Sequence, residues 1–283
     1  MSASSADLRF DRPVFLVGAP RSGVSALHDT LMRAPGVFMV RGAAHSVIDA
    51  MPALDIRAHG YDSNRLDASD ATPATIAEFR SRLADAARDR DGHAPPAGPF
   101  RLLDKLPKNA LRIPFLARVF PQARFIHYYR DPREVLAQML LAWQSGQFRT
   151  YLALPGWPRA HWSLALTPGW RELKGKPLAE IVAGQWQSAT QVLLDDLDGL
   201  PPDRWRVVRH ADFLANASGE IARLCLALDY DWDRPLDGGV ADPAPATAAD
   251  AAVIRSHAAD LQRLWPRMQP LATRAARMAG LHA

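Results

Sequence analysis

Residues 13–25 read PVFLVGAPRSGVS, an apolar run followed by a loop that holds two glycines. A continuous apolar run of this length that stops at Gly18 is typical of a strand buried on both faces of a parallel sheet. Leu27 and Leu31 then recur at helical spacing, and a second strand-like run occupies 37–40. The stretch therefore predicts a βαβ unit, with the glycine loop between its first strand and its helix.

The same alternation of strand and helix continues along the chain. Further strands are expected at 100–103, 124–129 and 205–209. Helices are expected at 25–33, 75–90, 109–120, 132–143, 178–197, 221–228, 251–265 and 270–279. This alternation predicts an α/β fold of three layers, in which helices flank a mainly parallel central sheet.

We expect the 283 residues to form a single domain, 1–283, around one large core. Between 144 and 177 the periodicity is lost, which predicts an aromatic loop or lid. This segment contains Trp157, Trp162 and Trp170. These tryptophans either line a ligand pocket or anchor the loop on the core. A stretch rich in Gly, Ala and Pro at 237–250 predicts a surface connection to a helical C-terminal segment at about 250–280.

The charge balance favours anionic small ligands over nucleic acid. Lys and Arg number 34 and Asp and Glu 30, so the formal net charge is +4. The basic residues are interspersed with acids and form no repeat with aromatic residues of the kind that follows a nucleic-acid backbone. We therefore expect a phosphate-bearing small molecule as a partner, and no nucleic acid.

Cysteine content and hydropathy predict a cytoplasmic protein. Cys225 is the only cysteine, so no intrachain disulfide forms, which suits a reducing compartment. No run of about 18 apolar residues occurs, so we expect no transmembrane segment. Residues 1–11 lack the basic and apolar regions of a secretory leader.

The loop between Gly18 and Gly23 has the spacing of a nucleotide-binding P-loop but lacks its lysine, because Val24 stands at that position. Ser25 matches the Ser or Thr that follows the lysine. The backbone N–H groups of such a loop, with the N-terminus of the next helix, bind a phosphate, and Arg21 adds a charged donor. The alternative is an ordinary strand-to-helix turn that carries two glycines.

Residues 15–26, FLVGAPRSGVSA, resemble the loop that binds the 5′-phosphosulfate in sulfotransferases that use 3′-phosphoadenosine 5′-phosphosulfate as donor. Further segments resemble that family's 3′-phosphate segment in order and spacing, namely DKLPKN at 104–109, IPFL at 113–116, FPQARFI at 120–126 and YRDPREV at 129–135. Weaker signatures of bacterial members are similar to PGWREL at 168–173, QW at 185–186 and RHADFL at 209–214. The resemblance covers about residues 13–270. It implies a P-loop-like fold, this donor and no catalytic metal.

The resemblance also implies roles for individual residues. The 5′-phosphate and the bridging oxygen would be bound by Arg21, Ser22, Gly23, Val24 and Ser25. Arg130 would bind the 3′-phosphate, and Gln138 stands where members commonly have a serine as second ligand of that phosphate. The alternative for Arg130 is a surface pair with Asp131 or Glu134.

The catalytic groups are less directly implied. Lys105 either lies against the transferring sulfuryl oxygens or pairs with Asp104. No histidine matches the base of cytosolic eukaryotic members, so His45, after the second strand, is the first candidate for the base and Asp104 the second. His210 and Asp212 are too few to indicate a metal site, and we assign none.

Three functions remain open at this point. The first is a sulfotransferase that acts on a hydroxyl or amine of a small-molecule, carbohydrate or lipid acceptor. The second is a P-loop kinase-like nucleotide enzyme, which would want a lysine where Val24 stands. The third is a non-catalytic bisphosphate-binding protein of the same fold. The sequence makes no prediction of the oligomeric state.

Overall fold

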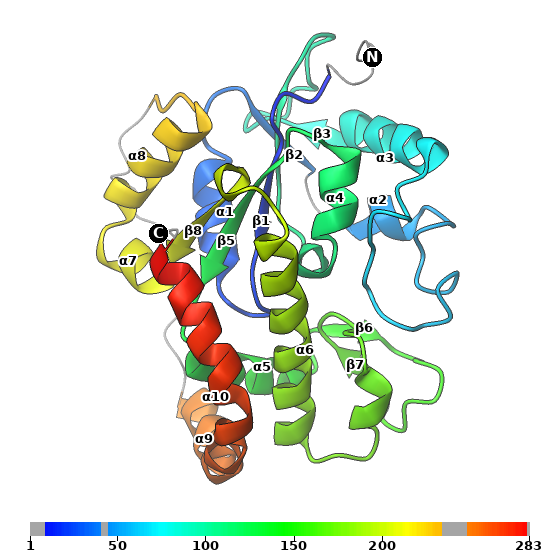
Figure 1. Ribbon diagram of the computed structural model, residues 1–283, viewed down its shortest axis with the longest axis vertical. Coiled ribbons are helices and arrows are strands. Elements are labelled where there is room, and N and C mark those ends of the chain that lie inside the picture. Colours follow the sequence, from blue (N-terminus) through cyan, green and yellow to red (C-terminus); the bar gives the residue numbers. More distant parts are fainter. Residues whose placement is uncertain (1–8, 41–44, 234–247, 282–283) are drawn as a thin grey trace.

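A six-stranded sheet forms the centre of the computed structural model, which describes residues 9–40, 45–233 and 248–281 (Figure 1). Its strands are β1 (Val14–Val17), β2 (Val37–Val40), β3 (Ala87–Arg88), β4 (Arg101–Asp104), β5 (Arg124–Tyr129) and β8 (Trp205–Arg209). They lie in the order β3-β2-β4-β1-β5-β8, and only β3 runs antiparallel to its neighbour. The prediction of a mainly parallel central sheet is confirmed.

The strand order places the glycine loop at a point where the chain changes direction along the sheet. From β1 the chain moves to β2 and β4 on one side, and afterwards to β5 and β8 on the other. Phe15 in β1 is level with Asp104 in β4 and Phe125 in β5, so the loops after these three strands leave at one edge. In open α/β sheets, ligands bind in the crevice outside the carboxyl ends of the strands at such a point.

Helices cover both faces of the sheet and complete the three layers (Figure 1). One face packs against α1 (Val24–Leu31), α7 (His210–Ala215) and α8 (Ala217–Leu228). The other packs against α2 (His45–Asp49), α3 (Pro73–Ala86), α4 (Ile113–Val119), α6 (Leu178–Asp198) and α10 (Ala258–Leu281). Alternation along β1 explains this division, because Leu16 belongs to the first core and Phe15 and Val17 to the second.

A further apolar core lies where α5 (Pro132–Ser145), α6 and α10 meet the segment between α5 and α6. This segment contains β6 (Arg149–Tyr151), β7 (Trp162–Ser163) and η2 (Trp170–Leu173). Trp157 and Trp162 meet edge to face at 4.8 Å, and Trp162 and Trp170 at 5.8 Å. All three rings are buried, so they anchor the segment on the core and do not line an open pocket.

Several predicted helix boundaries differ from the structure. The helix expected at 109–120 is divided into η1 (Pro107–Leu111) and α4, because Arg112 leaves helical geometry before α4 begins at Ile113, with Pro114 in its first turn. The helix expected at 75–90 begins at Pro73, after its cap Thr72, and ends at Ala86, where the chain enters the unpredicted strand β3.

At the C-terminal end, α9 (Ala248–Ser256) precedes one continuous helix, α10. The expected interruption between 265 and 270 is wrong, because Pro266 and Pro270 both lie within α10. Packing of α10 against α6, where Leu264, Met268 and Ala272 are buried, outweighs the hydrogen bonds that the two prolines remove. Most of the surface connection expected at 237–250 lies outside the described residues.

The short helix η3 (Pro202–Arg204) leads into β8, and β6 and β7 pair with each other as a separate two-stranded sheet.

Among the described helices, none combines the length with the apolar composition that crossing a membrane requires.

Candidate active site

The loop after β1 is shaped by two glycines. A Cβ atom at Gly18 would lie 2.7 Å from Ser22 Oγ and 2.9 Å from the backbone oxygen of Tyr128, so only glycine fits. Gly23 has φ 94° and is the N-cap of α1, where it supplies no capping side chain. The first N–H groups of α1 are therefore not satisfied by a cap, and the helix N-terminus favours an anion.

Two further features of this loop cost free energy in the structure as it stands. Arg21 has φ 65°, in the left-handed region that non-glycine residues seldom adopt. Ser22 is 1% exposed, and its hydroxyl oxygen has no hydrogen-bond partner among the described residues. A buried hydroxyl without a partner needs an explanation, and a bound phosphate oxygen supplies an acceptor for it.

Arg21 and Arg130 both face this loop. Partial burial and the nearby positive charge of Arg130 lower the pKa of Arg21. The Arg21 guanidinium stacks on the ring of Phe148, 4.2 Å from its centre. This contact joins the glycine loop, residues 18–23, to the segment just before β6. Phe148 was not among the site residues expected from the sequence.

The guanidinium of Arg130 contacts both Glu134 and the glycine loop. Its Nε donates a hydrogen bond of 2.7 Å to Glu134, which is the surface pair held open as an alternative. Its Nη1 lies 3.8 Å from the position that a Cβ of Gly23 would occupy. The Arg130 guanidinium therefore pairs with Glu134 through Nε and reaches the glycine loop through Nη1.

His210 is a further site residue that sequence reasoning did not place here. It is the first residue after β8, and its Cε1 lies 3.7 Å from the position of a Cβ at Gly23. Its Nδ1 is 2.8 Å from the hydroxyl of Tyr128. Burial, and then the charge of Arg130, lower the pKa of His210. The available signal was its place directly after a strand, the reasoning already applied to Arg130.

Lys105 follows β4 and reaches α1. Its ammonium donates a hydrogen bond of 2.9 Å to Ser25 Oγ, and no ion pair within 4 Å joins it to Asp104 among the described residues. Burial lowers the pKa of Lys105, against the opposing influence of Asp29 and Asp104. The ammonium lies at the first turn of α1, beside the loop.

Asp104 is buried at the end of β4. Its Oδ2 accepts a hydrogen bond of 2.7 Å from the amide of Asn109. Burial raises the pKa of its carboxyl group, partly offset by Asn109, His28 and Arg112. A raised pKa strengthens a carboxylate as a proton acceptor, and Asp104 is adjacent in sequence to Lys105.

The remaining predicted residues are His45 on α2, Gln138 on α5, and Val24 and Ser25 at the start of α1. His45 starts α2, but its side chain lies outside the described residues. Gln138 is half-buried on α5, and no described hydrogen bond joins it to Arg130. Val24 and Ser25 form the first turn of α1.

Two other groups of titratable residues are separate from this arrangement. His127 is buried in β5, and burial lowers its pKa to about 4, so it is neutral at pH 7. Among the described residues, ligand atoms of Asp89, Asp91 and His93 lie within 4.8 Å of one another, at the turn after β3. This group lies outside the loops that follow β1, β4 and β5.

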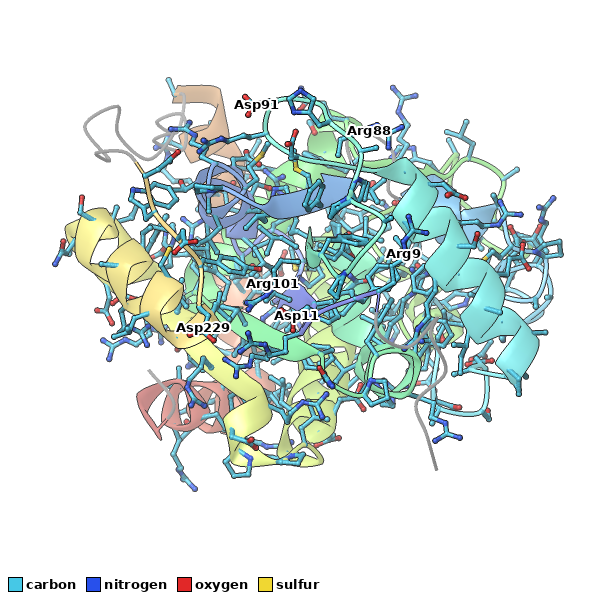
Figure 2. The ribbon with its side chains drawn as sticks, turned by 90° about the horizontal axis from the view of Figure 1, so that it is seen from above. Arg9, Asp11, Arg88, Asp91, Arg101 and Asp229 are labelled. Carbon is cyan, nitrogen blue, oxygen red and sulfur yellow. The ribbon has the colours of Figure 1, made fainter. Side chains whose placement is uncertain are left out.

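Arg12 and Arg101, near the amino ends of β1 and β4, are each paired with an acid. Arg101, at the start of β4, donates a 2.6 Å hydrogen bond to Asp11, and these side chains lie together in Figure 2. Arg12 donates one of 2.7 Å to Asp229. At the opposite edge of the sheet, Arg21 lies near Lys105 and near Arg130, whose Nε is paired with Glu134.

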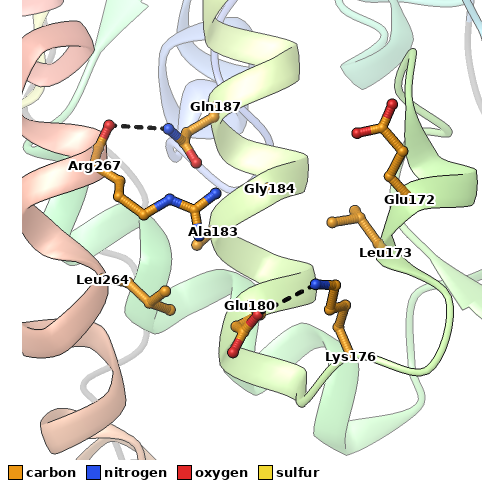
Figure 3. A pocket seen from close by; sticks show the side chains of 9 residues that line it. All are labelled: Glu172, Leu173, Lys176, Glu180, Ala183, Gly184, Gln187, Leu264 and Arg267. Atoms are coloured by element: carbon orange, nitrogen blue, oxygen red, sulfur yellow. Dashed lines mark hydrogen bonds and ion pairs between the residues drawn. The ribbon is translucent and has the colours of Figure 1, made fainter.

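Two pockets among the described residues lie away from this loop. One of about 200 Å³ lies between η2, α6 and α10, where Lys176 and Glu180 face each other at 4.0 Å (Figure 3). Another, of about 550 Å³, lies between α5, α9 and α10 and is mainly apolar. Neither is lined by a residue of the loop 18–23.

Comparison with known proteins identifies the family. The family model of the sulfotransferases matches residues 13–234. A sulfotransferase from Alicyclobacillus acidocaldarius is similar in structure, with a TM-score of 0.54 and 13% identity over 95% of this chain and 96% of that chain. A sulfotransferase from Mycobacterium tuberculosis H37Rv has a TM-score of 0.48 and 14% identity, over 91% of this chain and 75% of that chain. No curated protein matches this chain in sequence.

The structural likeness to the Alicyclobacillus protein supports the P-loop-like fold, in agreement with the observed strand order. The family match extends from the start of β1 to beyond α8 and covers well over half of the residues. This chain therefore belongs to the sulfotransferase family.

Proposed function

We propose that the protein transfers a sulfuryl group from 3′-phosphoadenosine 5′-phosphosulfate to a hydroxyl or amine group of a small-molecule, carbohydrate or lipid acceptor. The observation that carries this proposal is the pair of arginines, Arg21 and Arg130, at one glycine loop. They repel each other in the free protein, and a ligand with two separate phosphates would relieve that repulsion.

The donor would be divided between two parts of the site. The 5′-phosphosulfate would lie on the N–H groups at the start of α1, with Arg21 and the unpartnered Ser22 hydroxyl as further donors. The 3′-phosphate would be held by Arg130, with Gln138 as a second candidate. No step in this binding calls for a metal ion.

Transfer would follow the pattern of a loose phosphoryl transfer. The acceptor oxygen or nitrogen forms a bond to sulfur while the bond from sulfur to the bridging phosphate oxygen breaks, and the electron pair stays on that oxygen. Lys105, held by Ser25 at the first turn of α1, would stabilise the charge that develops there. The acceptor proton would pass to a base, for which Asp104 and His45 are the candidates.

The competing functions have weaker support. A kinase-like enzyme would need a lysine where Val24 stands and a carboxylate for magnesium, whereas Asp104 is buried and bonded to Asn109. A binding protein without catalysis would have no need for the lowered pKa of Lys105 or the raised pKa of Asp104. The single domain and the cytoplasmic location stay predictions.

Calorimetry with adenosine 3′,5′-bisphosphate tests the donor. We expect binding without magnesium, and tighter binding than that of ATP with magnesium. Arg130→Ala should weaken bisphosphate binding about 10- to 100-fold, the cost of a lost charged hydrogen bond, and barely affect adenosine 5′-monophosphate. Arg133→Ala, on the exposed side of α5, is the matched control and should retain binding.

Tighter binding of ATP with magnesium would overturn the proposal in favour of the kinase-like function. Turnover of labelled donor across a panel of hydroxyl and amine acceptors then separates an enzyme from a binding protein. Bisphosphate binding without turnover on any acceptor would support the binding protein.

A further inference from the structure

Among the described residues, His210 is the one histidine whose ring lies beside Gly23. The edge of the ring formed by Nδ1 and Cε1 faces Gly23, at 3.8 Å and 3.7 Å from the position of a Cβ there. Nε2 has no hydrogen-bond partner among the described residues, and it is not one of their fully buried unpartnered atoms. That nitrogen therefore has room for a partner that the described residues do not supply.

The partner of Nδ1 allows the ring to change its protonation state without moving. Burial raises the pKa of Tyr128, so its hydroxyl stays protonated and can donate to Nδ1 of a neutral His210. A hydroxyl oxygen also accepts hydrogen bonds, so it can receive one from Nδ1–H of a protonated ring. The 2.8 Å contact is thus compatible with both states.

The electrostatic environment of the ring becomes less positive when a polyanion binds. Arg130 disfavours a proton on His210 and Glu134 favours one. On its own helix, Asp212 is paired with Arg209 at 3.1 Å. Phosphates at the loop would offset the charge of Arg130, so a protonated imidazole would gain a neighbour of opposite charge.

We propose that His210 is the proton-binding group of the phosphate site, neutral in the free protein and protonated once the bisphosphate nucleotide is bound. The inference rests on the proposed function. In the bound state, Nε2–H and the positive charge of the ring would face a phosphate oxygen. The ring is a positioning and binding group here, and it takes no part in proton transfer from the acceptor.

Protonation that is linked to nucleotide binding makes the affinity depend on pH in a direction that can be measured. The free protein has the lower pKa at His210 and the complex the higher one, so binding takes up protons between these two values. Affinity for the bisphosphate would be greatest below both values. It would fall as pH rises through the interval, by at most about tenfold per pH unit for one proton.

Calorimetry of adenosine 3′,5′-bisphosphate in two buffers of different ionisation enthalpy counts these protons. We expect the wild type to take up a fraction of a proton more than His210→Gln, measured at the same pH so that protonation of the nucleotide itself cancels. His93→Gln removes an exposed histidine remote from the loop and should behave as the wild type. Equal uptake by the wild type and His210→Gln would overturn the inference, even if both bind tightly.

A second readout separates this inference from the proposed function. NMR titration of the ring nitrogens should show the pKa of His210 rise on addition of inorganic pyrophosphate, with the other histidines as internal controls. A rise with pyrophosphate in a protein that fails to bind the nucleotide would support the inference and count against the proposed donor. An unchanged pKa of His210 in the presence of saturating pyrophosphate would overturn the inference.

Discussion

Lys105 Nζ lies 2.9 Å from Ser25 Oγ, so the residue after β4 meets the first turn of the helix after β1. The two residues are 80 positions apart in the chain. The contact holds an ammonium group beside the N-terminus of α1, where both favour negative charge.

This contact predicts the effect of replacing the lysine. Lys105→Met should lower the rate of sulfuryl transfer about 10²- to 10³-fold, because a preorganised donor to the developing charge is lost. Bisphosphate affinity should change much less. Lys174→Met, on the exposed connection before α6, is the control and should keep the full rate. Turnover of labelled donor measures the effect, and an unchanged rate would remove Lys105 from the mechanism.

Gly18 should tolerate no side chain. Gly18→Ala places a Cβ against Ser22 Oγ and the backbone of Tyr128, so the loop or β5 must shift. We expect a loss of about 1–3 kcal/mol in the free energy of unfolding, together with loss of bisphosphate binding. Gly98→Ala is the matched control, because a Cβ there meets nothing within 4 Å. Urea unfolding and calorimetry measure the two effects, and normal binding by Gly18→Ala would contradict this account of the loop.

The buried carboxylate of Asp104 is expected to lower the free energy of unfolding at neutral pH. Its pKa is raised in the folded state, so its stabilising contribution is complete below the unfolded value, near 3.8, and is lost as pH rises through the folded value. Asp104→Asn keeps an acceptor for Asn109 and removes the buried charge, and should be more stable than the wild type at pH 7 by about 1 kcal/mol. In acid, the difference should vanish.

The same substitution tests the base. Asp104→Asn should lose most transfer activity if its carboxylate accepts the acceptor proton, while bisphosphate binding persists. Asp203→Asn, an exposed control, should change neither stability nor rate. Full activity in Asp104→Asn would leave His45 as the candidate base.

Phe148 should matter for the donor and not for folding. It is 36% exposed and stacks on Arg21, so Phe148→Ala removes a contact of about 0.5–1 kcal/mol that steadies the guanidinium. We expect bisphosphate binding to weaken a few-fold with an unchanged melting temperature. Leu152→Ala, at a more exposed position in the same segment, is the control. Equal affinities for Phe148→Ala and the wild type would show that the stacking has no part in donor binding.

The fold and the phosphate loop could be predicted because both depend on neighbours in sequence. The apolar run 13–17, the glycines at 18 and 23 and the helical spacing after them define the βαβ unit locally. Arg130 could be placed because the residue after a parallel strand lies at the carboxyl edge of the sheet. The same reasoning reached Lys105, although not its hydrogen bond to Ser25.

Helix ends at the C-terminal end of the chain were less predictable. Pro266 and Pro270 are helix breakers by their own chemistry, whereas burial of apolar α10 side chains, Leu264 and Met268 among them, favours a continuous helix. Likewise, the tryptophans of 144–177 have the same composition whether they line a pocket or fill a core. Their mutual packing decides between the two.

The sequence by itself determined the α/β fold, the glycine loop and the positions of the charged residues that follow β4 and β5, since strand and helix periodicity and turn chemistry act over a few residues. The tertiary structure alone decided that Phe148 supports Arg21, that Tyr128 holds His210 beside Gly23, and that Asp104 is buried on Asn109. Contacts between distant segments depend on how the strands are ordered and on which side chains share the space at the edge of the sheet. Burial and nearby charge, which shift the pKa values at this site, exist only after those segments have packed together.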